Sequence, residues 1–163
     1  MGFEIDSKRG VATHYGPRNQ NGKFGGQQNY EVGIVKSAIW DFAYNDLPSY
    51  GSNGLQFSIP AGASVLSAKL IVDVAFTSTS GTTDLDVGLY TSAGVAIDAD
   101  GLITVAEATQ TAIGTAGNVV TGAGALIGKT IGAAAGELVV TPSVADLTAG
   151  KGRILVEFIY DKN

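Results

Sequence analysis

The feature that most constrains this chain is an alternation of side-chain type between Val65 and Phe76, in the stretch VLSAKLIVDVAF. Its even positions are all apolar, and its odd positions include the charged residues Lys69 and Asp73. A period of two is typical of a half-buried strand in an antiparallel sheet. Ile71 and Ala75 interrupt the polar face and would be tolerated on a wet face or beneath a neighbouring chain. The stretch predicts the central strand of a β domain.

The same reasoning predicts further strands along the chain. The run from Tyr30 to Tyr44 places Trp40 and Phe42 on one apolar face, where they supply bulky side chains to the core or to a contact surface. The predicted strands are 30–44, 55–59, 65–76, 84–90, 137–141 and 153–160, with the last pairing near the middle of a sheet. With short strands between residues 114 and 136, the total is seven or eight. This pattern predicts an all-β fold, an antiparallel β-sandwich.

The region from residue 97 to residue 136 is less regular. Residues 97–111 predict a turn and a short helix with Asp100 as N-cap, although Ile103 and Val105 fit a strand equally well. Residues 114–136 are rich in glycine and alanine, which allow close backbone approach between elements or between subunits. The alternative for this stretch is a loosely packed excursion on the surface.

Composition excludes several classes of protein. The chain has 163 residues, enough for one domain and an appendage, and no cysteine, which excludes disulfides, zinc knuckles and thiol nucleophiles. No secretory signal or membrane-spanning run is recognisable, so we expect a soluble protein made in the cytoplasm. Charged residues make up only 15% of the chain, which suggests that other chains cover part of its surface.

Charge divides the chain into two parts. Residues 1–29 carry a net charge of +2 and residues 30–163 a net charge of −7. An acidic body is a poor match to nucleic acid, so no direct nucleic-acid contact is expected, and none with a membrane. We expect residues 1–29 to form an extended N-terminal anchoring arm and residues 30–163 to form the β-sandwich domain.

The arm is rich in glycine, asparagine and glutamine, yet it carries spaced aromatic and basic side chains. Arginine and aromatic residues supply much of the binding energy at protein interfaces. The predicted partner-binding residues are therefore Tyr15, Arg18, Lys23 and Phe24. The alternative is a solvated tail that holds no partner.

Candidate catalytic and metal-binding residues are few. His14, the single histidine, lies in the arm rather than on a rigid scaffold, so no catalytic residue is predicted. Asp98-Ala99-Asp100-Gly101 resembles the opening of a calcium loop, but Ile103 and Val105 stand where further oxygen ligands are wanted. Turn and cap chemistry explains this cluster, and the Asp84–Asp86 pair, more simply. No metal or cofactor is predicted.

Several segments together resemble small virion proteins of tailed bacteriophages, in particular capsid decoration (cement) proteins. They are YGPRNQNGKFGGQ, SIPAGASVLSAKLIVDVAF, DLDVGLY with AIDADGL, and the closing LTAGKGRILVEFIY. The resemblance covers most of residues 54–163 and is one of style and order, and residues 114–136 depart from it. It implies a jelly-roll-like β domain without an active site that sits, often as a trimer, on neighbouring capsid subunits.

The resemblance leads to a specific expectation. It implies a virion structural protein on the capsid exterior, assembled in the host cytoplasm, which binds the major capsid protein and self-associates as a homotrimer. An alternative is a tail or fibre module that binds host-surface glycan through Tyr50 and Tyr90. A small hydrolase on a β scaffold is the third possibility, for which no acid–base pair is evident.

Overall fold

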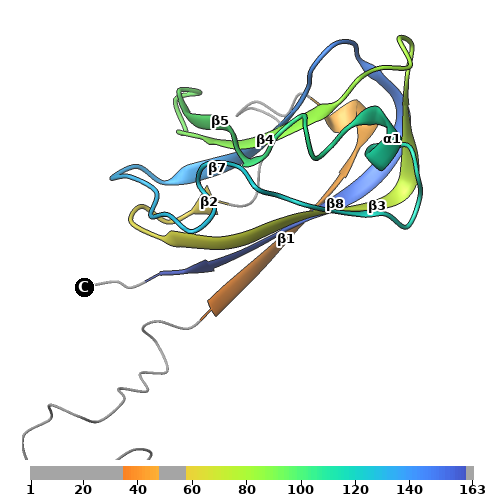
Figure 1. Cartoon of the computed structure of the whole chain (residues 1–163). Coiled ribbons are helices and arrows are strands. Elements are labelled where there is room, and N and C mark those ends of the chain that lie inside the picture. Colours follow the sequence, from red (N-terminus) through yellow and green to blue (C-terminus); the bar gives the residue numbers. More distant parts are fainter. Residues whose placement is uncertain (1–34, 48–57, 161–163) are drawn as a thin grey trace, which may run out of the picture.

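The chain folds into two four-stranded antiparallel sheets that face one another (Figure 1). The computed structural model describes residues 35–47 and 58–160. One sheet has the order β1-β8-β3-β6 and the other the order β2-β7-β4-β5. The strands are β1 (Val35–Ala43), β2 (Ser58–Ile59), β3 (Ser64–Ser78), β4 (Leu85–Tyr90), β5 (Ala96–Ile103), β6 (Val119–Thr121), β7 (Gly136–Pro142) and β8 (Leu147–Ile159). A 3₁₀ turn, η1 (Tyr44–Asp46), follows β1, and a single helical turn, α1 (Gln110–Ile113), precedes β6.

The strands pair in a nested pattern. β4 pairs with β5, β3 with β6, β2 with β7 and β1 with β8, so the chain resembles one long hairpin folded over on itself. The further pairs β3–β8 and β4–β7 complete the two sheets. This order is the connectivity of an eight-stranded jelly roll. The all-β antiparallel sandwich predicted from the sequence is confirmed.

The core lies between the two sheets and is filled by aliphatic and aromatic side chains. On β8, Ile154, Val156 and Phe158 are buried at alternate positions, as their spacing predicted. At one end of the sandwich the rings of Trp40, Phe42 and Phe76 form a stack, with centroids 5.1 Å and 5.4 Å apart. The aromatic residues of β1 therefore pack against Phe76 of β3 and extend the core to the edge strand.

The predicted central strand is present as β3, between β8 and β6, but its alternation is not uniform. Leu66 and Val74 were expected to face inward and are instead 39% and 50% exposed, whereas Val65 is fully buried. Register shifts relative to β8 fall between Val65 and Ser67 and again between Val72 and Val74. Each bulge inserts a residue and reverses which side chains face the core.

Two local predictions were wrong. Residues 97–103 belong to strand β5 rather than to a turn and helix, so Asp100 is not an N-cap. The helical turn begins at Gln110, and Thr109 caps it by accepting a hydrogen bond from the Ala112 amide at 3.4 Å. The strand predicted at 153–160 begins earlier, at Leu147, and its residue Gly150 has a φ of +127° and packs against the Phe76 ring.

The glycine- and alanine-rich stretch contains the short strand β6 between tightly packed loops. A Cβ on Gly122 would overlap the carbonyl of Leu102, and one on Gly124 would overlap the backbone of Gly101. The Gly122 amide donates to the Ala68 carbonyl at 2.9 Å. Close backbone approach between elements is confirmed here, and the loosely packed alternative is wrong.

Several sequence predictions fall on residues outside the described ranges. These are the arm, the first part of the strand predicted at 30–44 and residues 55–57 of the next strand. Among the described residues, no helix has the length and apolar character that crossing a membrane requires.

Candidate interaction surface

The side of the β1-β8-β3-β6 sheet that faces away from the core is the surface best suited to contact a partner. Because alternate residues of β8 are buried, the residues between them point outward, together with their cross-strand neighbours. We call this surface the outer face. Its central residues are Val35, Ser37, Ile39, Asp41, Ser67, Lys69, Ile71, Asp73, Val74, Val119, Thr121, Lys151, Arg153, Leu155, Glu157 and Ile159.

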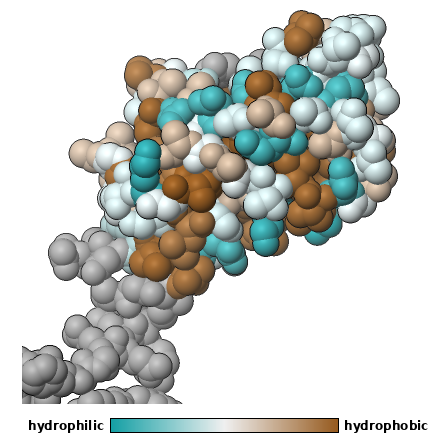
Figure 2. All heavy atoms as spheres, viewed as in Figure 1, coloured by the Kyte–Doolittle hydropathy of each residue, from teal (hydrophilic) through white to brown (hydrophobic). Residues whose placement is uncertain are grey.

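Apolar side chains cross the outer face from one edge of the sheet to the other. Ile39 on β1 lies opposite Leu155 on β8, and Ile71 on β3 lies opposite Val119 on β6. Ile39 is 59% exposed and Val119 54% exposed. Figure 2 shows apolar side chains gathered near the beginning of β1. An antiparallel sheet with one solvated face usually carries polar residues there, so apolar residues on all four strands indicate a contact surface.

Two charged side chains of the outer face, Arg153 and Asp73, form an ion pair with each other. Arg153 donates from Nε to Asp73 at 2.9 Å and from a terminal nitrogen at 2.7 Å, a bidentate arrangement. These hydrogen bonds lower the pKa of Asp73 below its usual value. Ser67 donates to Glu157 at 2.7 Å across β3 and β8. Hydrogen bonds within the sheet therefore already hold these four polar side chains in place before a partner binds.

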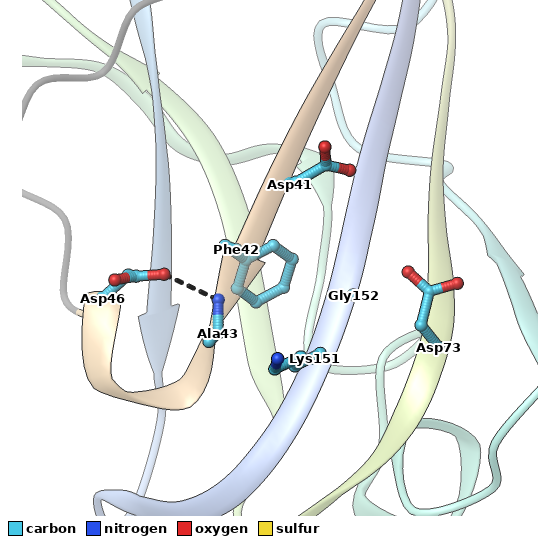
Figure 3. A pocket seen from close by; sticks show the side chains of 7 residues that line it. All are labelled: Asp41, Phe42, Ala43, Asp46, Asp73, Lys151 and Gly152. Carbon is cyan, nitrogen blue, oxygen red and sulfur yellow. Dashed lines mark hydrogen bonds between the residues drawn. The ribbon is translucent and has the colours of Figure 1, made fainter.

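A pocket of about 300 Å³ lies at the end of the outer face where β1 meets η1. Figure 3 shows Asp41 and Asp73 on either side of β8, with Gly152 between them. Asp46 accepts a hydrogen bond from the Ala43 amide at 2.7 Å and so closes the 3₁₀ turn. The remaining lining residues are Phe42 and Lys151. Its open shape and mixed charges suit a side chain of a partner protein.

Sequence reasoning named the arm as the binding element and missed the outer face. The predicted residues Tyr15, Arg18, Lys23 and Phe24 lie outside the described residues. The sequence does contain a signal for the outer face, because an apolar residue interrupts the polar side of each of two strands. Ile71 falls on the polar side of its strand, and Ile39 lies between Ser37 and Asp41 on the polar side of β1.

The acidic pairs considered for calcium serve the backbone instead. Asp84 accepts a hydrogen bond from the Gln110 amide at 2.7 Å, and Asp86 accepts one from the Val105 amide at 2.9 Å. Within residues 35–47 and 58–160, no group of three or more potential ligands is placed to hold a metal ion. Asp84 thus fixes the start of α1, and Asp86 fixes the chain after β5.

Asp98 and Asp100 give a testable pH dependence. Partial burial, with the adjacent Asp100 carboxyl, raises the pKa of Asp98 above its ordinary value of 3.8. The ionised side chain therefore costs stability above this raised pKa, and the cost disappears as the pH falls below the unfolded value. We expect Asp98→Asn to raise the free energy of unfolding by a few tenths of a kcal/mol near pH 7, since the site is mostly accessible to water.

Urea unfolding of both proteins near neutral pH and in mild acid measures this effect. The advantage of the variant should shrink as the pH falls through the raised pKa of Asp98, because the wild-type carboxyl then becomes protonated. Asp146→Asn, on an exposed segment just before β8, removes the same charge and controls for the lower net charge. An equal advantage at both pH values would contradict the expectation.

Of the two aromatic residues expected to bind glycan in the alternative function, Tyr90 is not on the surface. Tyr90, expected on an exposed platform, is only 9% exposed at the end of β4. Tyr50 lies outside the described residues. The buried position follows from the β4–β7 pairing, because Tyr90 lies opposite Glu137 within the sheet rather than on a loop.

Comparison with known proteins gives one distant likeness. No protein-family model matches the sequence, and no curated protein matches it. A chain of the cyanophage Pam1 capsid asymmetric unit is similar in structure, with 18% sequence identity and a TM-score of 0.49. The alignment covers 88% of this chain and 96% of that one. A likeness this distant assigns neither a family nor a function.

Proposed function

We propose that the protein is a non-enzymatic virion structural protein that decorates the exterior of a phage capsid and stabilises it by bridging neighbouring shell subunits. Residues 1–29 serve as the anchoring arm, with Tyr15, Arg18, Lys23 and Phe24 against the major capsid protein. Residues 30–163 form the β-sandwich domain, which self-associates as a homotrimer. The protein is made in the host cytoplasm and added there to the shell.

The observation that carries this proposal is the outer face, with apolar residues on all four strands of its sheet. The inward-facing side chains of both sheets are used in one core, so the contacts of the domain fall on its outer surfaces. The outer face includes Val35 at the start of edge strand β1, directly after the segment that carries the arm. The resemblance of 54–163 to decoration proteins supports the same assignment.

Labelling of virions tests the location. Antibodies against the chain should mark the heads of phage particles in electron micrographs, and a glycan array should give no signal. Label confined to tails, together with binding to defined glycans, would replace this proposal with the glycan-binding alternative.

A further inference from the structure

We propose that the outer face of the β1-β8-β3-β6 sheet packs against the outer face of a second copy of this chain. This inference adds a second, two-fold contact to the homotrimer of the proposed function, because a face that packs on the same face of another copy closes at two chains. Because association between copies needs no capsid, the contact proposed here and the proposed binding to a capsid can be disproved independently.

The first argument is the exposed apolar area. Ile39, Val119 and Val74 are each at least 50% exposed, and they lie on three different strands of one sheet. Leu155 and Ile71 fill the space between them and are half-buried by their neighbours within the sheet. Sheets with such faces pack against one another through interdigitating apolar side chains, as the two sheets of this domain do internally.

The second argument is the distribution of charge. Residues 35–47 and 58–160 contain five basic and eleven acidic side chains. The outer face holds three of each sign: Lys69, Lys151 and Arg153 against Asp41, Asp73 and Glu157. The rest of the described domain therefore holds two basic and eight acidic residues. Asp46 lies at the rim of the outer face and can be counted with it. The outer face then carries a net charge of −1, and the rest of the described domain carries a net charge of −5.

This distribution favours a second copy as the occupant. Two acidic domains repel one another through most of their surfaces, and the nearly neutral outer face is where that repulsion is least. The face also carries both signs, so a cation of one copy can lie near an anion of the other. A strongly basic partner would instead be drawn to the acidic remainder of the domain.

The third argument is the state of the polar groups. Burial of a charged side chain is costly unless the charge is paired and hydrogen-bonded. On the outer face, Asp73 already accepts two hydrogen bonds from Arg153, and Glu157 accepts one from Ser67. A second copy can cover these pairs without finding new partners for them, which lowers the cost of desolvation for this half of the charged residues. Lys69, Lys151 and Asp41 are the charges that would face partners across the contact.

The experiment measures the mass of the full chain in solution by sedimentation over a wide concentration range. The wild type should self-associate. Ile39→Glu should weaken that association by at least about tenfold, because it places a charge among the apolar side chains of the contact. Val95→Glu is the matched control, since Val95 is 62% exposed in the turn between β4 and β5, away from the outer face. It should leave the association unchanged.

A second measurement does not depend on disrupting the contact. Because the chain has no cysteine, single substitutions report accessibility to a thiol reagent. In the associated form, Ile39→Cys and Val119→Cys should react at least about tenfold more slowly than Val95→Cys. Ile39 and Val119 lie on opposite edge strands of the sheet, so packing through the whole face protects both.

Three results would overturn the inference. A wild-type chain that stays monomeric up to millimolar concentration would remove the contact between copies. An oligomer that tolerates Ile39→Glu as well as Val95→Glu would place the contact elsewhere. Protection of Ile39→Cys without Val119→Cys would indicate edge-to-edge pairing through β1. Binding to capsid shells, measured separately, bears on the proposed function and not on this contact.

Discussion

Replacing Phe76 with alanine is expected to lower the free energy of unfolding by about 3–5 kcal/mol, the usual cost of removing a buried aromatic side chain. Phe76 is fully buried on β3, and its ring stacks on Phe42 at 5.4 Å. Gly150 and Gly152 of β8 lie against the same ring and have no side chains to fill the cavity. The loss should appear as a lower midpoint in urea unfolding followed by circular dichroism.

Tyr44→Ala is the matched control for this prediction. It removes a ring of similar size from η1, where the side chain is 40% exposed. Its cost should be below about 1 kcal/mol, because Tyr44 is exposed and lies outside the buried core. Equal destabilisation by the two substitutions would show that the aromatic stack does not support the core in the manner described here.

Deleting residues 1–29 is expected to reduce binding to capsid shells by at least about a hundredfold and to leave the domain folded. The proposed contacts of Tyr15, Arg18, Lys23 and Phe24 are then lost, whereas the first strand of the described residues, β1, begins at Val35. Cosedimentation with shells measures binding, and the urea midpoint of the truncated chain reports on folding.

Point substitutions locate the effect within the arm. Alanine at Tyr15, Arg18, Lys23 and Phe24 together should reproduce most of the loss. Alanine at Asn19, Gln20, Gln27 and Gln28 changes the same segment without removing an aromatic ring or a charge, and should have little effect. Undiminished binding after the deletion would contradict the anchor.

The strands of the sandwich could be predicted because the inward positions of β4, β7 and β8 follow a strict period of two. Leu85, Val87 and Leu89 are buried as expected. Prediction failed where a tertiary contact set the local structure. The bulges that expose Leu66 and Val74 depend on pairing with β8, and nothing within Val65–Phe76 reveals them. Residues 97–103 form a strand because β4 lies beside them.

The candidate surface was harder to predict than the fold. The outer face brings together Ile39, Ile71, Val119 and Leu155 from four strands, and their neighbourhood is defined only by strand order and register. Each residue alone is an ordinary exposed apolar side chain. From the sequence, Ile71 could lie on a wet face or beneath a neighbour, and Ile39 was not singled out, so the order β1-β8-β3-β6 was needed to join them.

The balance of charge on the outer face is a consequence of the same register. Arg153 lies opposite Asp41 on one side and Ile71 on the other, and it reaches Asp73 diagonally. The net charge of −7 for residues 30–163 gives no indication that one sheet face is nearly neutral. Charge averaged along a sequence hides such a face, because neighbouring strands come from distant parts of the chain.

The most direct test of the central claim mixes the purified chain with phage shells assembled without this protein, from the phage to which the proposed function assigns it. The claim predicts that the chain sediments with the shells at a fixed ratio to the major capsid protein and raises their melting temperature. A chain that remains in the supernatant and leaves the melting of the shells unchanged would contradict a role in decorating and stabilising the capsid.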